Sequence, residues 1–210
     1  MINHYVYTFN RETNGMHIQR LDRRQARQMP WKNGGGVTCE LAIAPAGAGL
    51  EDFAWRISCA QVARGGPFSH FAGVDRSLAL LDGAGLDLRL DGQPRQLRPS
   101  DPALVFAGES EVSAELLDGP ISDFNLMTRR SLWRHQLQPL QLDGAQALHN
   151  DADILLIYCH RGRLAVQLAE GSVQTLSDGQ GLLLEDERAE LTLSGAAGTL
   201  LYVGRLYRQP

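Results

Sequence analysis

The sequence predicts an all-β protein built from two β-barrels in tandem, and three observations support this. Helix signals are scarce: only RLDRRQARQ at 20–28 could form two helical turns, and Pro30 ends any helix there. From Thr38 onward, short apolar runs alternate with Gly, Asp, Pro and Ser at a spacing typical of sandwiches and barrels. The third observation is an internal repeat, which makes the second half of the chain resemble the first.

The predicted strands are short and run through most of the chain. Their expected ranges are 38–44, 53–61, 77–82, 85–91, 103–107, 112–117, 123–129, 154–159, 162–168, 172–176, 181–185, 189–194 and 199–207.

The repeat has a nearly constant offset. LDLRL at 86–90 is echoed by LAVQL at 164–168, 78 residues later. Further apolar positions match at offsets of 78 or 79, namely Leu97 with Leu176, Leu104 with Leu182 and Val112 with Leu191. The alternative is that any all-β chain aligns with itself at some shift. We therefore predict an N-terminal barrel at 17–140, which carries the pocket, and a C-terminal barrel at 141–210 that is completed by strands exchanged with the first half.

Composition excludes several classes of protein. About 43% of the 210 residues are hydrophobic, which is enough for a packed core. The net charge is -4 and no block of basic residues occurs, so neither nucleic acid nor a membrane surface is an expected partner. No apolar run approaches the ~18 residues of a membrane span, and the first twenty residues lack a signal peptide's apolar stretch. We expect a cytoplasmic protein, in which Met16 is an alternative start and residues 1–15 are a poorly ordered extension.

The three cysteines, Cys39, Cys59 and Cys159, are far apart in the sequence. An odd number without a C-x-x-C pair favours buried thiols over disulfides or a zinc site.

The stretch WKNGGGVTCE at 31–40 contains three consecutive glycines, which are entropically costly. A Walker loop and a Rossmann turn both require a following helix, whereas a strand is predicted here. The remaining interpretations are a tight bend or a close approach of the backbone to a ligand, and a triplet modestly favours the ligand.

Three predicted strands carry polar sets on one face, because side chains alternate along a strand. The sets are Thr38 with Glu40, Arg56 with Ser58, and Asp123 with Asn125 and Met127. These faces are either ordinary solvent-exposed faces or the lining of a barrel interior, and a small barrel can hold one small ligand.

The stretch GGPFSHFAGVDRSLALLDG at 65–83 contains one histidine, His70. A metal site needs two or three converging ligands, and neither a neighbouring histidine nor a nearby carboxylate other than Asp75 is present. No G-x-S-x-G nucleophile motif occurs in the chain. We predict no metal, no cofactor and no catalytic residue.

Four stretches in order, PWKNGGGVTCE, FAWRIS, GPFSHFAGVDRSLALLDG and SDFNLMTRR, resemble the HutD/Ves family over about residues 17–207. This family is similar to cupins and has two barrels in one chain, the bicupin arrangement with minimal helix. Residues 65–83 stand where cupins carry their metal motif, and only His70 is present, so the resemblance implies a cupin that has lost its metal. HutD-type proteins are associated with histidine utilisation, which implies a regulatory role and a ligand such as N-formyl-L-glutamate or urocanate. The Ves branch is only loosely linked to stress.

The resulting hypothesis is a metal-free protein that binds a small anionic metabolite in the N-terminal barrel. Arg56 is the expected carboxylate partner, because a guanidinium offers paired donors. Asn33 and the N–H groups of Gly34, Gly35 and Gly36 are expected to hold a formamide or a second carboxylate. Thr38, Ser58 and Asn125 are expected to supply hydrogen bonds, and Glu40 and Asp123 to orient Arg56 or accept a ligand N–H. Phe71 and Met127 are the expected apolar walls, and Ser69 completes the expected ligand-binding residues.

Two other classes of function stay open from the sequence. One is an enzyme that uses Glu40 with Asp123, or Glu40 with His70, as acid and base on an amide or sugar-like substrate. The other is a non-catalytic interaction module whose barrels dock on a partner or on a second copy. Bicupins often pair, so a homodimer is one assembly to test.

Overall fold

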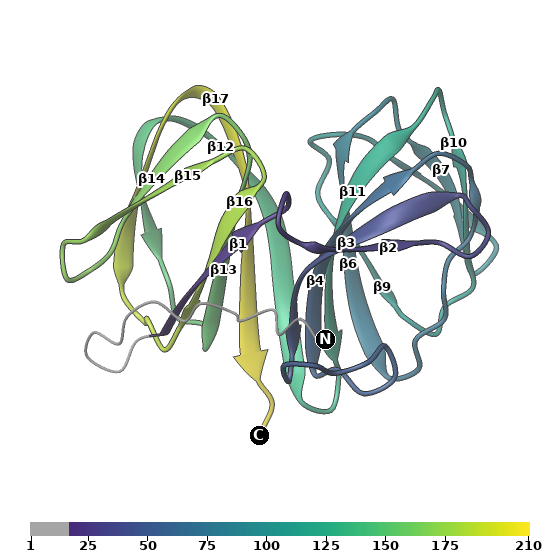
Figure 1. Cartoon of the computed structure of the whole chain (residues 1–210), viewed down its shortest axis with the longest axis horizontal. Helices are drawn as coiled ribbons and strands as arrows, with labels where there is room; N and C mark the ends of the chain where they lie inside the picture. The colour runs from purple at the N-terminus through teal and green to yellow at the C-terminus, as the bar shows by residue number, and fades with distance from the viewer. Residues whose placement is uncertain (1–16) are drawn as a thin grey trace, which may run out of the picture.

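Every regular element in the part of the chain that the structure describes, residues 17–210, is a β-strand. In this computed structural model the strands form two lobes that lie side by side (Figure 1). The all-β prediction is confirmed. No helix among these residues is long and apolar enough to cross a membrane. The expectations for Met16 and residues 1–15 lie outside the described residues.

The N-terminal lobe consists of two sheets that face each other. The six-stranded sheet contains, in order, β2 (Arg27–Pro30), β3 (Gly36–Ala44), β4 (Trp55–Val62), β11 (Ile121–Arg129), β6 (Val74–Asp82) and β9 (Leu104–Ala107). The four-stranded sheet contains β5 (Gly66–Pro67), β10 (Val112–Leu116), β7 (Leu86–Leu90) and β8 (Gln93–Leu97). Leu78 and Leu80 of the first sheet pack with Leu86 and Leu88 of the second, so the two sheets enclose an interior.

The C-terminal lobe is one curled, seven-stranded sheet. Its strands are, in order, β1 (His17–Asp22), β16 (Gln180–Glu185), β13 (Ile154–Arg161), β17 (Glu190–Arg208), β14 (Arg163–Gln167) and β15 (Val173–Ser177), with β12 (Trp133–His149) paired to β17. The long strand β17 pairs with β14 through its first part and with β13 through its last part. It therefore joins both sides of the curl around an apolar core that includes Leu155, Val166 and Leu193.

Strand pairing shows that the two lobes are copies of one topology. β6 pairs with β11 and β9, as β13 pairs with β17 and β16. β7 pairs with β8 and β10, as β14 pairs with β15 and β17. Even the irregularity matches, because the register shifts between Ser122 and Asp123 in one lobe and between Cys159 and Arg161 in the other. The repeat predicted from sequence is therefore a repeat of structure.

Two expectations for the start and middle of the chain differ from the structure. The segment at 20–28 is not helical: β1 ends at Asp22 and β2 begins at Arg27. The pairing of β1 with β16 buries Leu21, and this tertiary contact outweighs the weak helix propensity. The predicted boundary at residue 140 falls inside β12, which pairs with β17 along its length, so the second lobe begins near residue 133 and also includes β1.

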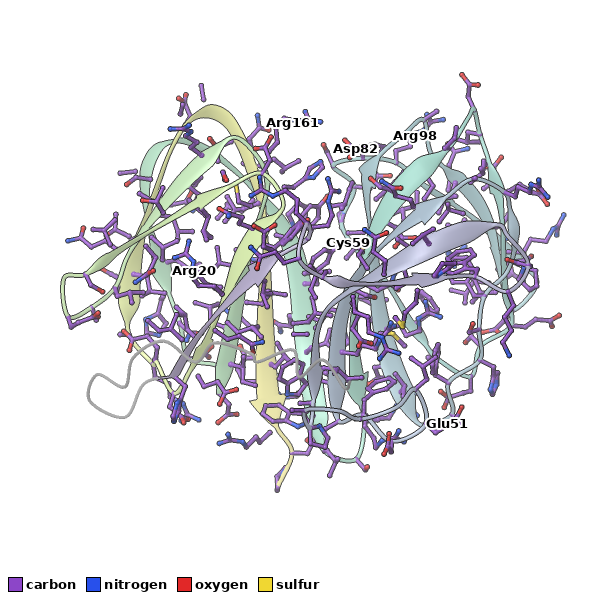
Figure 2. The ribbon with its side chains drawn as sticks, viewed as in Figure 1. Arg20, Glu51, Cys59, Asp82, Arg98 and Arg161 are labelled. Atoms are coloured by element: carbon purple, nitrogen blue, oxygen red, sulfur yellow. The ribbon has the colours of Figure 1, made fainter. Side chains whose placement is uncertain are left out.

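The two lobes pack through an aromatic core. Phe124 of β11 stacks on Tyr202 of β17, with ring centroids 5.8 Å apart and planes 11° apart, and lies 4.8 Å from Tyr158. Cys59 lies in the same contact (Figure 2), where its thiol donates to the Tyr158 hydroxyl at 3.6 Å. All three cysteines are free; Cys59 and Cys159 are buried as predicted, whereas Cys39 is half-buried. Because this face of β4 and β11 points to the second lobe, the opposite face points into the N-terminal barrel.

Candidate ligand-binding site

The polar faces predicted from sequence all line the interior of the N-terminal barrel. Strand register places Glu40 opposite Ser58, and Ser58 opposite Asn125. It also places Met127 between Arg56 on one side and Arg76 on the other. The side chains that share this interior face are Thr38, Glu40, Arg56, Ser58, Arg76, Asp123, Asn125 and Met127, all buried or half-buried. Two guanidinium groups are thus brought into one low-dielectric space.

Arg56 is already paired inside the barrel. Its Nε donates to Glu40 Oε2 at 2.7 Å, and the two side chains are only 7% and 8% exposed. The predicted partnership of Glu40 with Arg56 is therefore present in the structure. Because this ion pair neutralises the Arg56 charge, Arg56 is a weaker candidate for a ligand carboxylate than the sequence suggested.

Arg76 is a buried cation that pairs with no carboxylate among residues 17–210. Its Nη2 donates to Asn125 Oδ1 at 3.0 Å, its Nη1 donates to the Ser69 carbonyl at 3.3 Å, and its Nε has no hydrogen-bond partner among the described residues. Burial lowers the pKa of Arg76 to about 10, so it stays charged at neutral pH. Its guanidinium carbon lies 5.0–5.6 Å from the ring centroids of Phe68, Phe71 and Phe106. Arg76 was not predicted as a site residue; it lies just before the strand predicted at 77–82, and β6 in fact begins at Val74.

Asp123 lies deep in the same interior. Its carboxylate accepts from Asn125 Nδ2 at 2.9 Å and from the backbone N–H of Ala60. Burial raises the pKa of Asp123 to about 7, although the nearby charge of Arg76 opposes this rise. Since Asp123 is partly protonated at neutral pH and Glu40 pairs with Arg56, the interior keeps an excess of positive charge.

The glycine loop does not offer the free amides that were expected. The Gly34 N–H donates to the Trp31 carbonyl at 3.0 Å, and the Gly35 N–H donates to Asn33 Oδ1 at 2.9 Å. The Thr38 hydroxyl accepts from Trp31 Nε1 at 2.8 Å. The expectation of free N–H groups was wrong for Gly34 and Gly35, because these groups close a turn before β3.

The same loop explains why glycine is needed at two of the three positions. Gly34 has a φ of +67°, a backbone conformation that residues other than glycine adopt only at a cost in energy. A Cβ on Gly36 would lie 2.6 Å from the Gln61 carbonyl and 3.1 Å from the Trp31 ring. The close approach that the triplet signalled is therefore an approach to β4 and to Trp31.

The segment before β6 contributes less than expected. Ser69 and His70 are exposed, and it is the Ser69 carbonyl that contacts Arg76. Phe71 is half-buried and packs edge-on against Phe53, with centroids 6.1 Å apart. Within residues 17–210, no three His, Cys, Asp or Glu side chains gather as metal ligands would. The exposed His70 also makes a poor acid–base partner for Glu40, which is turned into the barrel.

The HutD family model matches residues 23–201. The chain belongs to the HutD family. It is 41% identical over 181 residues to an uncharacterized 21.2 kDa protein in the hutC 3' region of Pseudomonas putida, which covers 85% of this chain and 93% of that protein. It is 42% identical over 116 residues to protein Ves of Cronobacter sakazakii, covering 53% of this chain and 62% of Ves. The predicted family, with its association with histidine utilisation, is confirmed.

Solved structures of other proteins are also similar to this chain. A conserved protein of unknown function from Pseudomonas aeruginosa PAO1 superposes with a TM-score of 0.85 at 35% identity, over 90% of this chain and 98% of that one. HutD from Pseudomonas fluorescens SBW25, crystallised in a formate condition, gives 0.77 at 33% identity, over 92% and 100%. Bacterial pirin YhhW of Escherichia coli in complex with nickel(II) gives 0.63 at 12% identity over 90% and 98%, which shows a shared cupin-like fold and nothing more.

The stretches that carry the HutD resemblance meet in the barrel interior. WKNGGGVTCE contributes Glu40, FAWRIS contributes Arg56, GPFSHFAGVDRS contributes Arg76, and SDFNLM contributes Asp123 and Asn125. In this chain these stretches together form a buried polar cluster that contains two arginines.

Proposed function

We propose that this HutD-family protein binds a small anionic metabolite inside its N-terminal barrel and that binding, not chemistry, is its function. The observation that carries the proposal is Arg76, a buried cation that has neither a carboxylate partner nor a partner for its Nε within residues 17–210. A buried charge without a partner costs several kcal/mol, and a ligand carboxylate would offset that cost. Arg76 replaces Arg56 in this role because Arg56 is already paired with Glu40.

The surroundings of Arg76 suit a carboxylate on a small, partly apolar body. Asn125 supplies a neutral hydrogen-bonding group next to the guanidinium, and Ser58 lies opposite Asn125 on the neighbouring strand. Three aromatic rings border the cation, and they would contact the apolar part of a ligand. Combined with the association of the HutD family with histidine utilisation, this favours N-formyl-L-glutamate or urocanate as the ligand.

The biological role that follows is regulatory. A protein that binds a pathway intermediate without consuming it reports the level of that intermediate. In this proposal the protein acts in the cytoplasm, without a metal or cofactor, as a monomer or a homodimer.

A thermal-shift screen of the metal-stripped protein tests the proposal. The panel contains N-formyl-L-glutamate, urocanate, histidine, glutamate and formate, with Zn²⁺, Fe²⁺ and Mn²⁺ tested separately. A concentration-dependent rise in melting temperature with one metabolite, and none with the metals, supports the proposal because ligands that bind only the native state stabilise it. A rise with a metal alone overturns it.

An enzyme remains the second candidate, and one observation favours it. The pKa of Asp123, raised by burial to about 7, suits a general acid or base at neutral pH. In that case water would hydrolyse N-formyl-L-glutamate to glutamate and formate. Formate release at a rate that Asp123→Asn abolishes would favour the enzyme over the binding protein.

A further inference from the structure

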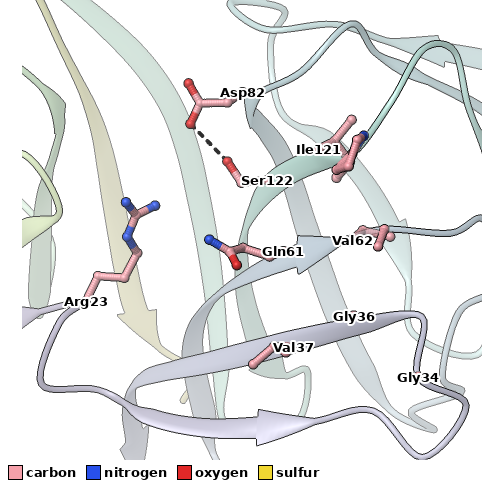
Figure 3. Close-up of a pocket in the computed structure, with 11 residues that line it drawn as sticks. Arg23, Gly34, Gly36, Val37, Gln61, Val62, Asp82, Ile121 and Ser122 are labelled. Atoms are coloured by element: carbon pink, nitrogen blue, oxygen red, sulfur yellow. Dashed lines mark hydrogen bonds between the residues drawn. The ribbon is translucent and has the colours of Figure 1, made fainter.

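A second polar region lies on the N-terminal lobe beside Arg23, which joins the two barrels. A cleft of about 570 Å³ opens there, next to the glycine loop and away from the barrel interior. Figure 3 shows its walls, which include Arg23, Gly34, Gln61, Asp82 and Ser122. The volume lies in the range of small-molecule sites, and the lining mixes one cation, one carboxylate and neutral donors.

Arg23 reaches into this cleft from the connection between the two lobes. Its backbone N–H donates to the Gly179 carbonyl at 2.9 Å, which fixes this connection to the C-terminal lobe. Its side chain extends toward Gln61 and Ser122 of the N-terminal lobe (Figure 3). Its guanidinium, which is half-buried, forms no hydrogen bond or ion pair with any residue in 17–210. One wall of the cleft thus presents a guanidinium whose paired N–H groups have no partner among residues 17–210.

The opposite wall carries a fixed carboxylate. Asp82 Oδ2 accepts from the Ser122 hydroxyl at 3.0 Å. Asp82 Oδ1 lies 3.5 Å from both Arg161 Nη2 and His160 Nε2. Asp82 and Arg161 face each other from the two lobes (Figure 2) and hold equivalent positions, since each follows the matching register shift. The cleft therefore lies where the two repeats meet.

His160 lies next to Asp82 and does not itself line the cleft. Its side chain is 6% exposed, and its Nε2 has no hydrogen-bond partner among the described residues. A hydrogen bond of the ring to the backbone of Leu81 favours the charged ring, whereas burial favours the neutral one. Burial lowers the pKa of His160 below its ordinary value, which favours this neutral form. Among the described residues Asp82 Oδ1 accepts no hydrogen bond, since both Arg161 Nη2 and His160 Nε2 lie 3.5 Å away.

We propose that this cleft is a second ligand site, for a small molecule that places a carboxylate on Arg23 and an amine or amide N–H on Asp82. Such a ligand supplies an anion to the Arg23 guanidinium and a hydrogen-bond donor to Asp82 Oδ1. The site is independent of the one proposed in the N-terminal barrel, because the two share no residue.

An NMR titration of the full-length ¹⁵N-labelled protein tests this site, with L-glutamine as probe because it carries a carboxylate, an amine and an amide. Propionate is the comparator that has a carboxylate and no N–H donor. L-glutamine is expected to shift the amide signals of Gly34, Ala63 and Ser122, and to bind at least about tenfold more tightly than propionate. Shifts confined to Asn125 and Phe71, or no shift at concentrations up to about 10 mM, would overturn the proposal.

Two variants test which residue binds the carboxylate of the ligand and which binds its N–H donor. Arg23→Gln leaves no group unpaired, so it should fold normally and weaken L-glutamine binding at least about tenfold. Arg24→Gln is the matched control, since the neighbouring Arg24 is exposed and paired with Asp22, and it should bind like the wild type. Asp82→Asn should remove the preference for L-glutamine over propionate. Unchanged binding in Arg23→Gln, or an unchanged preference in Asp82→Asn, would contradict the assignment.

Discussion

Arg76 Nη2 donates to Asn125 Oδ1 at 3.0 Å, and Asn125 Nδ2 in turn donates to Asp123 at 2.9 Å. The amide thus stands between the buried cation and the nearest buried carboxyl group. Asn125 keeps Arg76 and Asp123 from forming a direct ion pair, which leaves the Arg76 Nε without a partner. Under the proposed function, the Arg76 guanidinium is the group that receives the ligand's carboxylate.

The ion pair of Arg56 with Glu40 predicts a stability effect instead of a binding effect. Arg56→Ala should lower the free energy of unfolding by about 3–5 kcal/mol, because it leaves the buried Glu40 carboxylate unpaired. Urea unfolding followed by fluorescence measures this. Adding Glu40→Gln in the same chain should restore part of the loss. A loss below about 1 kcal/mol would mean that the pair is not buried as described.

Asp123 predicts that ligand affinity depends on pH. The pKa of Asp123 is about 7 because burial raises it, so the carboxyl group is mostly protonated at pH 6 and mostly charged at pH 8. A charged Asp123 repels a ligand carboxylate, and the affinity for an anionic ligand should therefore rise as the pH falls from 8 to 6. Asp123→Asn should flatten this dependence. Equal slopes for the two proteins in calorimetric titrations would rule out Asp123 as the cause.

The buried His135 should make the stability of the fold sensitive to acid. It bridges Thr128 Oγ1 at 2.7 Å and Ser77 Oγ at 2.9 Å, and burial lowers its pKa to about 4. A group whose folded pKa is depressed gives stability that is present above its unfolded pKa of about 6.5 and is lost as the pH falls toward 4. The loss attributable to His135 should reach about 3 kcal/mol near pH 4.

Comparing variants isolates this contribution. His135→Gln should lower stability at pH 7 and reduce the loss between pH 6.5 and 4, as followed by urea unfolding at each pH. His70→Gln, at an exposed site, should leave that slope unchanged. If His135→Gln retained the full acid slope, another group would be responsible.

The glycine loop predicts a large difference between two neighbouring substitutions. Gly36→Ala should destabilise by more than about 2 kcal/mol, because its Cβ would collide with the Gln61 carbonyl. Gly34→Ala should cost only about 1 kcal/mol, since it strains a positive φ but meets no atom within 4 Å. Thermal unfolding distinguishes them, and equal effects would refute the packing explanation.

Strand alternation let the sequence identify much of the site. The side chains of Glu40, Arg56 and Asn125 were assigned to polar faces, and these faces do line the barrel. The sequence could not say which way the faces point. That depends on the second lobe, whose aromatic residues cover the other face of β4 and β11.

Other features were not predicted, because the local sequence around them resembles that of an exposed segment. Arg76 follows Asp75 at the start of a strand and looks like half of a surface charge pair. Asp75 instead pairs with Arg130 at the surface, whereas Arg76 turns inward. Strands β8 and β12 were missed because most of their side chains are exposed, and β12 also contains Pro139 and Gly144. Their pairing is set by tertiary contacts that no short window contains.

Isothermal titration of N-formyl-L-glutamate into the wild type and Arg76→Gln tests the central claim most directly. The wild type should bind with one site per N-terminal barrel, and Arg76→Gln should fold and lose at least about tenfold in affinity. Arg89→Gln, an exposed arginine on β7, is the matched control and should bind like the wild type. Unchanged binding by a folded Arg76→Gln variant would contradict the account. So would a wild-type protein that binds neither urocanate nor N-formyl-L-glutamate.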